Sequence, residues 1–130
     1  MIVRTLDELA VSDRHIVTPN WRSTRLIVKA DGMGYSVHHT VIPAEHEVHC
    51  HYEQHFETNY VIAGRGEVFH TASGRTFPLA VGTVYALDKH DEHIVRAIES
   101  DLHLVCVFNP PLSGTETHNL KGGYDSSDDA

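Results

Sequence analysis

The sequence predicts an all-β domain made of many short strands, arranged as a sandwich or a barrel. Helical periodicity is absent after the first ten residues. Short β-rich runs follow instead, and glycine, proline, aspartate and asparagine punctuate them at close intervals, which is typical of these two architectures. The chain has 130 residues. Because one domain usually takes roughly 100–200 residues, we expect a single domain.

The expected elements follow in order from the N-terminus. Thr5-Leu6-Asp7-Glu8 has the pattern of a capping box, so we expect a short helix at about residues 5–10. Asn109-Pro110-Pro111 should end the last strand, because proline removes a backbone donor. The expected strands cover residues 22–29, 34–42, 46–51, 55–63, 66–71, 75–77, 82–86, 92–98 and 102–108. The expected turns lie at 31–32, 43–44, 64–66, 73–74 and 89–91.

Composition and charge exclude several classes of protein. The formal net charge is −8 and no basic run is present, so we expect no nucleic-acid partner. No apolar stretch is long enough for a membrane span, and the first residues lack the pattern of a secretory signal. Two cysteines, Cys50 and Cys106, do not make a disulfide framework, which favours the cytoplasm. The 12 histidines suggest a metal site.

The densest group of possible metal ligands lies within residues 49–57. His49, His51, His55 and Glu57 are all odd-numbered and would share one face of a continuous strand. At about 3.3 Å per residue the first and last would lie roughly 26 Å apart, too far to bind one ion. Only His55 and Glu57 converge without a bend near residues 52–54. The alternative is a solvated edge strand of polar residues.

Two intervals resemble the signature motifs of the cupin superfamily, a small jelly-roll-like β-barrel that usually holds a divalent metal. Six residues separate Glu57 from Gly64, and ten separate Gly82 from His93. The usual pattern takes two histidines and a glutamate from the first motif and one histidine from the second. This chain departs from that ligand set. The departures are five residues between His51 and Glu57, Asp88 and His90 in place of proline and glycine, and Ala97 in place of asparagine.

These departures resemble one cupin family, the ectoine synthases, and the likeness covers nearly the whole chain. Each matching segment is weak alone, but together they occur in order and at near-constant intervals. They are residues 1–5, Trp21 with Arg25, residues 31–34, His51 and Tyr52 with His55 and Glu57, residues 86–91 with His93, residues 104–112, and Gly114, Glu116 and His118. His38 stands near a pocket position where the family has a smaller polar residue, which leaves substrate choice open.

The resemblance implies that Glu57, Tyr85 and His93 are the metal ligands and that the metal is iron(II), with other divalent metals possible in vitro. A carboxylate, a phenolate and an imidazole suit a first-row divalent ion. Three protein ligands also leave open coordination positions, as catalytic sites do. From the residues alone, Tyr85 could equally be a core aromatic and His93 a loop histidine. No role is assigned to His49, His51, His90 or His103.

The resemblance also implies a set of substrate-binding residues. Arg25 offers a planar fork for a carboxylate, and Trp21 offers a flat wall with an N–H donor. Without the resemblance, Trp21 would be interpreted as core filler, Arg25 as a surface charge and residues 116–118 as a solvated segment. The full set is Trp21, Arg25, Thr40, Tyr52, Leu87, Phe108, Glu116 and His118.

The implied activity is an intramolecular condensation that closes N4-acetyl-L-2,4-diaminobutyrate to ectoine with loss of water, a hydro-lyase reaction. A Lewis acid would activate the amide carbonyl, and a base must take a proton from the attacking amine. Glu116 and His118 are the first candidates for amine binding and proton transfer, and Tyr52 and His55 the second. Three alternatives stay open: an iron- and O₂-dependent cupin oxygenase, a non-enzymatic cupin that binds a small zwitterion, and an enzyme for a related amide.

Two segments remain at the C-terminus. Residues 112–120 follow the Pro-Pro stop and, by the resemblance, form a lid that carries Glu116 and His118, so we count residues 1–120 as the barrel domain with its lid. Residues 121–130 are polar and acidic, and we expect a flexible tail there. The resemblance also implies a homodimer, with the small-molecule substrate as the other partner and no membrane contact.

Overall fold

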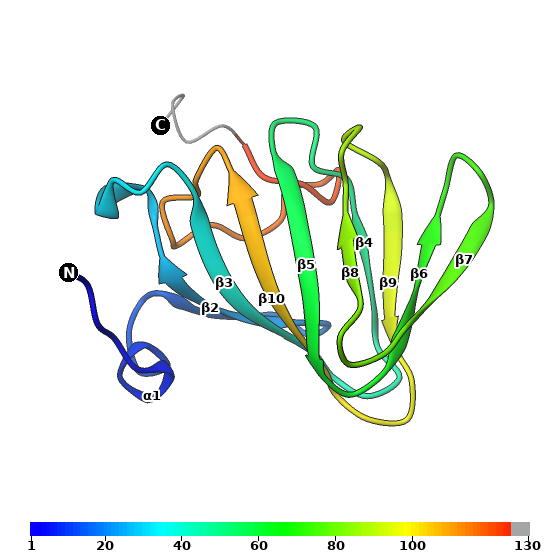
Figure 1. Cartoon of the computed structure of the whole chain (residues 1–130), viewed down its shortest axis with the longest axis horizontal. Coiled ribbons are helices and arrows are strands. Elements are labelled where there is room, and N and C mark those ends of the chain that lie inside the picture. Colours follow the sequence, from blue (N-terminus) through cyan, green and yellow to red (C-terminus); the bar gives the residue numbers. More distant parts are fainter. Residues whose placement is uncertain (126–130) are drawn as a thin grey trace.

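The protein consists of two antiparallel sheets that face each other. A computed structural model of the chain describes residues 1–125, and Figure 1 shows the sheets side by side. The first sheet has the strand order β1-β2-β3-β10-β5-β8, and the second has the order β4-β9-β6-β7. The elements are α1 (Leu6–Leu9), β1 (His15–Val17), β2 (Arg22–Ile27), η1 (Lys29–Asp31), β3 (Ser36–Ile42), β4 (Glu47–Cys50), β5 (Phe56–Ala63), β6 (Gly66–His70), β7 (Arg75–Leu79), β8 (Val84–Ala86), β9 (His93–Ala97) and β10 (Leu102–Asn109).

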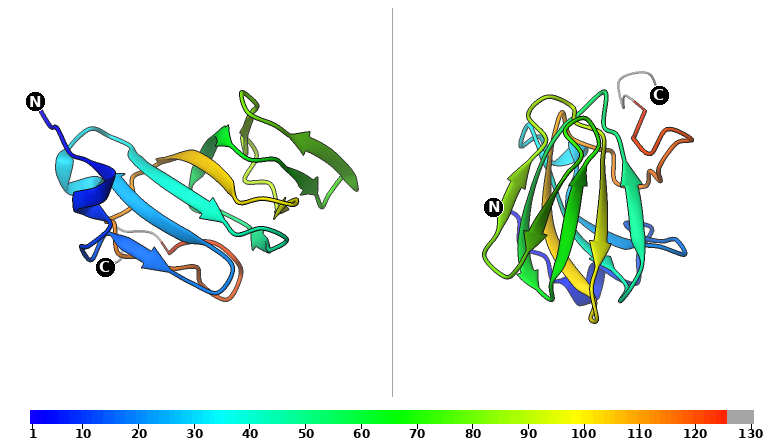
Figure 2. Two further views of the ribbon diagram at one scale, coloured as in Figure 1. Left: turned by 90° about the horizontal axis from the view of Figure 1, so that it is seen from below. Right: turned by 90° about the vertical axis from the view of Figure 1, so that its right-hand side faces the viewer.

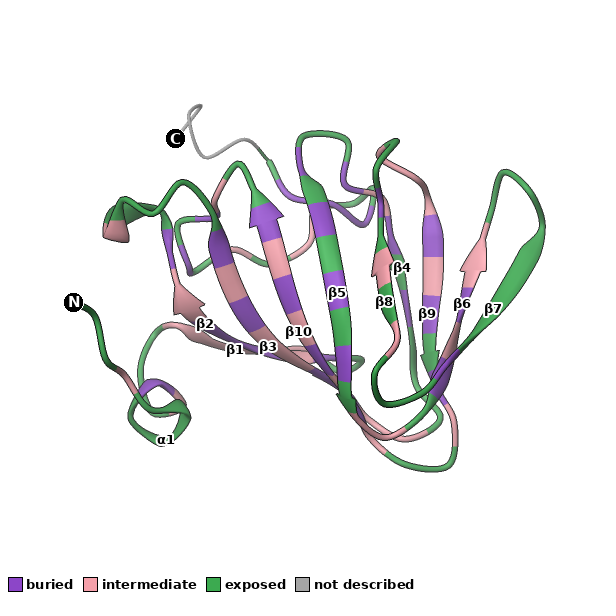
Figure 3. Ribbon diagram, in the orientation of Figure 1, coloured by how far each residue is buried: buried purple, intermediate pink, exposed green. Residues whose placement is uncertain are grey.

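Alternation of side chains along the strands builds an interior that changes character from one end to the other. On β5, Glu57, Asn59 and Val61 point inward, and on β10 the inward residues include Leu104 and Phe108. Figure 3 shows this alternation as bands of buried and exposed residues. Because period-two alternation puts every second residue on one face, the polar residues at the start of β5 share the interior with apolar ones. The apolar residues form the core, and the polar residues at the start of β5 are available for binding or catalysis.

The expected helix and its capping box are confirmed. The Thr5 hydroxyl accepts a hydrogen bond from the Glu8 amide at 3.2 Å, and the Glu8 carboxylate accepts one from the Thr5 amide at 2.6 Å. These bonds satisfy two of the backbone donors that a helix start leaves free. Among residues 1–125, no helix has the length and apolar character needed to cross a membrane.

All of the expected strands are present, with two corrections to the first part of the chain. The three-residue strand β1 was not predicted from the sequence, because three residues give too short a period to recognise. The strand expected to reach residue 29 ends at Ile27, and a 3-10 turn follows. Asp31 favours this turn, because its carboxylate accepts the Val28 amide at 2.9 Å and pairs with both terminal nitrogens of Arg4 at 2.8 Å.

The C-terminal segment crosses the open end of the barrel. The Leu112 carbonyl accepts the Lys29 amide at 2.8 Å, and further on the Gly122 carbonyl accepts the His51 amide at 2.9 Å. The segment therefore runs from the first sheet to the second, as the two views of Figure 2 show. Within the tail expected over residues 121–130, Tyr124 is 5% exposed and packs into the barrel. Residues 126–130 of that tail lie outside the described residues.

Candidate active site

A cavity lies between the two sheets, beneath the C-terminal segment. Its walls combine aromatic and aliphatic side chains with a few polar groups, which is typical of a small-molecule site. The lining residues are Trp21, His38, Thr40, Ile42, Val48, Cys50, Tyr52, Glu57, Asn59, Tyr85, His93, Val95, Leu104, Cys106, Phe108, His118 and Tyr124.

All three expected metal ligands line this cavity, and they come from three different strands. Glu57 is the second residue of β5, Tyr85 lies in the middle of β8, and His93 begins β9. The register places Tyr85 opposite Asn59, two residues from Glu57 on the same face of β5. His93 enters from the second sheet, and its ring centroid lies 6.3 Å from that of Tyr85. The trio therefore spans the gap between the sheets.

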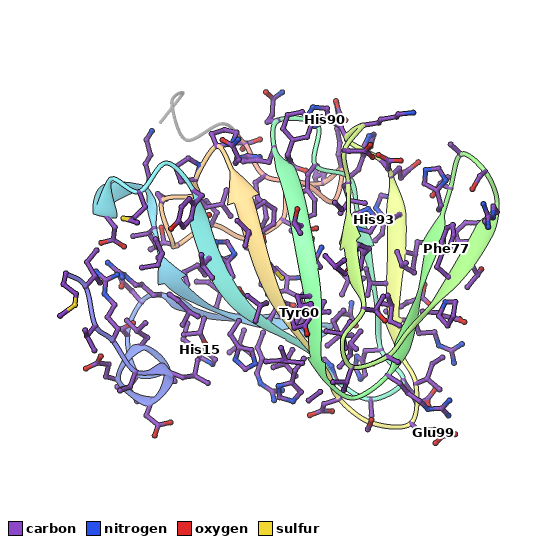
Figure 4. The ribbon with its side chains drawn as sticks, viewed as in Figure 1. His15, Tyr60, Phe77, His90, His93 and Glu99 are labelled. Atoms are coloured by element: carbon purple, nitrogen blue, oxygen red, sulfur yellow. The ribbon has the colours of Figure 1, made fainter. Side chains whose placement is uncertain are left out.

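The His93 imidazole presents a free lone pair. Its Nδ1 lies 2.8 Å from the Asp91 carbonyl oxygen, and because a carbonyl can only accept, Nδ1 carries the proton and donates it. Its Nε2 is buried and has no hydrogen-bond partner among the described residues. Burial also lowers the pKa of His93 to about 4, so the ring is neutral at neutral pH. A neutral, oriented imidazole with an unpaired nitrogen is the form that binds a metal. Figure 4 labels His93 at the start of β9.

The two other members of the trio are acids that need a cation. Burial raises the pKa of the Glu57 carboxyl to about 7 and raises that of the Tyr85 hydroxyl well above its ordinary value. A divalent ion beside them would favour both ionised forms. No three histidine, cysteine, aspartate or glutamate side chains within residues 1–125 are grouped to hold an ion by themselves. A centre here therefore depends on the Tyr85 phenol, and the donor set of Glu57, Tyr85 and His93 fits a first-row divalent metal.

Arg25 is a buried cation without an acidic partner among the described residues. Its side chain is fully buried, Nε donates to the Ser23 hydroxyl at 3.1 Å, and Nη2 donates to the Tyr124 hydroxyl at 3.3 Å. Nη1 is buried and has no partner among residues 1–125. Thr40 supports this arrangement, because its hydroxyl donates to the same Ser23 oxygen at 3.3 Å. A buried guanidinium with a free N–H is suited to the carboxylate of a bound ligand.

Aromatic rings from the C-terminal segment complete the cavity. The His118 ring packs against Trp21 with centroids 5.1 Å apart, and its Nε2 lies 2.9 Å from the Tyr52 hydroxyl. Tyr124 stacks on Tyr52 at 5.3 Å. Gly122 and Gly123 permit this close approach, because a Cβ on either would collide with the backbone at His49 or His51. The segment is therefore a wall of the cavity.

Four of the expected site residues do not line the cavity. Arg25 lies behind Trp21 and Tyr124, and Leu87 packs beside Tyr85 around a separate cavity. His55 is fully buried against Phe108 and Tyr124, and neither ring nitrogen has a partner among the described residues.

Glu116 is the clearest difference, because the sequence suggested that it points inward beside His118. Its carboxylate instead accepts the amides of Ser113, Gly114 and Thr115 at 2.7–3.0 Å and stabilises its own loop.

The histidine-rich segment bends instead of continuing as one strand, so its odd-numbered residues do not share one face. Residues 51–55 form no strand, so His49 and His51 stay apart from the cavity while Glu57 enters it. His90 holds this bend, because its Nδ1 lies 2.9 Å from the carbonyl oxygens of both Tyr52 and His55.

Asn59, Tyr124 and His38 are among the cavity residues that were not predicted from the sequence. Asn59 follows Glu57 by two positions, so strand alternation alone could have predicted it. Tyr124 follows the Gly122-Gly123 pair, a signal for close backbone approach that was read as part of a tail. His38 was noted only as a departure; its Nε2 lies 3.1 Å from the Ser36 hydroxyl and its ring packs on Phe108.

These features define a small cupin-type barrel with an enclosed cavity that is suited to a metal centre. A cupin 2 conserved barrel domain protein from Salinispora arenicola shares the fold, with a TM-score of 0.66 and 20% identity over 83% of this chain and 87% of that one. At that identity the likeness shows the fold alone.

Closer relatives define the family. A family model described as ectoine synthase matches residues 1–128, and the chain belongs to the ectoine synthase family. The L-ectoine synthase of Teredinibacter turnerae is 49% identical over 132 residues, which cover 100% of this chain and 99% of that protein. That of Vibrio cholerae is 48% identical over 124 residues, covering 95% and 89%. The crystal structure of ectoine synthase from P. lautus matches with a TM-score of 0.87 and 44% identity, covering 95% and 88%.

Proposed function

We propose that this chain catalyses the L-ectoine synthase reaction of its family, the closure of N4-acetyl-L-2,4-diaminobutyrate to the cyclic amidine ectoine with loss of water. The observation that carries the proposal is a pair of unsatisfied groups at one cavity. Arg25, buried behind the Trp21 and Tyr124 rings of the cavity wall, has an Nη1 without a partner among the described residues. His93, which lines the cavity together with Glu57 and Tyr85, has an unpaired Nε2. The substrate supplies a carboxylate for Arg25, and its amide carbonyl suits a metal ion held by His93.

The donor set supports iron(II) as the cofactor, held by Glu57, Tyr85 and His93. When bound, a divalent metal acts as a Lewis acid and makes an amide carbonyl more electrophilic.

We assign the positioning of the substrate to Arg25, Trp21 and Phe108. The free Nη1 of Arg25 attracts the carboxylate from behind the wall formed by Trp21 and Tyr124. The flat rings of Trp21 and Phe108 hold the chain in a folded conformation with its two ends together. Such positioning replaces a search through open conformations and can supply several kcal/mol of the barrier. The segment that carries His118 and Tyr124 excludes bulk water, which limits hydrolysis by solvent in the cavity.

Proton transfer is assigned to His118 with Tyr52. Burial lowers the pKa of His118 to about 4, so its imidazole is neutral in the folded protein. We assign to it the proton that the attacking amine loses. The Tyr52 hydroxyl, 2.9 Å from Nε2, fixes the ring and links it to the cavity wall. His55 stays a second candidate because both of its ring nitrogens lack partners among the described residues. Glu116 is proposed to order the loop of residues 113–115 and so hold His118 in place.

The experiment incubates iron(II)-loaded protein with N4-acetyl-L-2,4-diaminobutyrate and follows substrate and product by chromatography while an oxygen electrode records O₂. Conversion to ectoine without oxygen uptake supports the proposal. Oxygen uptake coupled to substrate loss would favour the oxygenase alternative. Tight binding without turnover would favour the non-enzymatic cupin, and turnover of a different amide would favour the related enzyme.

A homodimer is proposed as the assembly, in the cytoplasm. Exposed apolar side chains support it, because Ile2 and Val3 near the N-terminus, Tyr60 and Ile62 on β5 and Val84 on β8 are all more than two-fifths exposed. Two buried, free thiols support the reducing compartment. Light scattering after size-exclusion chromatography measures the mass, and a monomer mass would contradict the dimer.

A further inference from the structure

A second hydrogen-bonded network lies directly beside the turn that carries His93. His70, the last residue of β6, is the register partner of His93 across the second sheet. Its Nε2 lies 2.7 Å from Oδ2 of Asp91, and its Nδ1 lies 2.7 Å from the Ser73 hydroxyl. A neutral imidazole satisfies both contacts, with Nε2–H donating to the carboxylate and Nδ1 accepting from serine.

Asp91 links this network to the candidate metal ligand. Its carboxylate accepts from His70 and from the Lys89 amide at 3.0 Å, while its backbone carbonyl accepts the Nδ1–H of His93 at 2.8 Å. The direction of the His93 ring therefore depends on where the Asp91 peptide group is held. The two hydrogen bonds to the Asp91 carboxylate hold this residue, and with it the peptide group, in place.

We propose that His70 and Asp91 are positioning residues that aim His93 Nε2 into the metal centre. This inference rests on the proposed function, because it takes His93 as a metal ligand. Groups that hold the far nitrogen of a ligating histidine tune metal affinity, typically by about 10–100-fold. Here a carbonyl holds that nitrogen, and the His70–Asp91 pair holds the carbonyl.

The pair is separate from the substrate cavity. His70 and Asp91 border a second cavity on the other side of Tyr85 and His93, together with Leu87. The side chains of the pair are 29% and 17% exposed. A substitution at His70 can therefore change the alignment of His93 without opening the main core or removing a group that touches substrate.

The chain contains a matched control one residue away. His49 Nε2 lies 2.6 Å from Oε2 of Glu92, so this is a histidine–carboxylate pair of the same kind, between β4 and the same turn. The Glu92 carbonyl accepts the Thr71 amide at 3.2 Å, whereas the His93 ring is held by the Asp91 carbonyl. Loss of the His49–Glu92 pair should leave the ligand unaffected.

The test measures cobalt(II) binding to the metal-free full-length chain by titration, with the visible absorption of the bound cobalt as a second readout. His70→Leu is expected to weaken cobalt binding about 10–100-fold and to change the spectrum. His70→Gln places an amide N–H near the original Nε2 and should restore most of the affinity. His49→Leu should match the wild type in both readouts. The thermal midpoints of the metal-free proteins show whether each variant is folded.

The outcomes separate the two proposals. Cobalt binding by the wild type with an unchanged constant and spectrum in His70→Leu would overturn the positioning role alone. No cobalt binding by the wild type would overturn the metal centre and this inference with it. Should His70→Leu fail to fold, Asp91→Asn keeps the carbonyl, loses the charge-assisted bond and decides the question by the same two readouts.

Discussion

The guanidinium of Arg25 lies 3.3 Å from the hydroxyl of Tyr124, measured from Nη2 to the phenolic oxygen, although the two residues lie 99 positions apart in the chain. This contact joins β2, near the start of the barrel, to the last described part of the C-terminal segment. The C-terminal segment is therefore a structural part of the site, because its Tyr124 hydroxyl accepts a hydrogen bond from the buried Arg25 guanidinium.

Removal of the C-terminal segment is expected to abolish turnover without unfolding the barrel. A chain that ends at Leu112 keeps Glu57, Tyr85 and His93 but loses the His118 ring and the Tyr124 wall, so it should bind metal and fail to convert substrate. A chain that ends at Tyr124 should keep nearly full turnover. Activity, circular dichroism and metal content of the two chains check this. A shorter chain that retains its rate would show that the segment has no part in catalysis.

Substitution of Arg25 by lysine is expected to raise KM about 10–100-fold with a smaller effect on kcat. The fork of Arg25 makes charge-assisted hydrogen bonds worth roughly 1.5–3 kcal/mol each, and an ammonium cannot keep the bonds to Ser23 and Tyr124 while binding a carboxylate. Steady-state kinetics with N4-acetyl-L-2,4-diaminobutyrate measure the split. Arg96→Lys, at an exposed site on β9, serves as the control. An unchanged KM in Arg25→Lys would place the carboxylate elsewhere.

The sequence predicted the barrel well because strand alternation and turn residues are local signals. The starts of β5 and β9, and with them Glu57 and His93, could be located from the punctuation of the chain. The interior position of Glu57 also follows from period two, once β5 is known to begin after a bend. The candidate ligands therefore came from local pattern and family likeness together.

The remaining parts depend on contacts between distant segments, which no local pattern contains. Glu116 and His118 alternate along the chain, and in an extended segment both could point inward. In the structure, Glu116 instead satisfies three backbone amides of its own loop, which an extended chain would leave free. The polar neighbours of Tyr124 predict a tail. They carry no information about its stacking partner, Tyr52, which is distant in the sequence.

Acid should destabilise the wild type more than a variant without the His38 imidazole. Burial lowers the pKa of His38 well below its ordinary value, and Arg25 and His55 lower it further. The unfolded chain protonates this residue below a pH of about 6.5 while the folded protein does not, so its contribution to stability is lost as pH falls. As the pH falls from 7.5 to 5, the free energy of unfolding of His38→Gln should therefore rise relative to that of the wild type. A difference that is independent of pH would contradict the assignment.

Loss of a metal ligand should remove metal and activity together. Glu57→Ala and His93→Ala are each expected to lower bound iron at least about tenfold, because two protein ligands hold a divalent ion far less firmly than three. His103→Ala, on the outer face of the first sheet where His103 pairs with His39, is the control and should retain its metal. Elemental analysis after gel filtration gives the metal content. Equal content in all three variants would show that the ligands are misassigned.

Turnover is expected to require a metal held in this cavity. The most direct measurement titrates iron(II) into metal-free protein and records, in the same samples, bound iron and the rate of ectoine formation. We predict no turnover without metal and a rate that rises in proportion to bound iron up to one equivalent per chain. A metal-free preparation, verified by elemental analysis, that converts the substrate at the full rate would contradict the account.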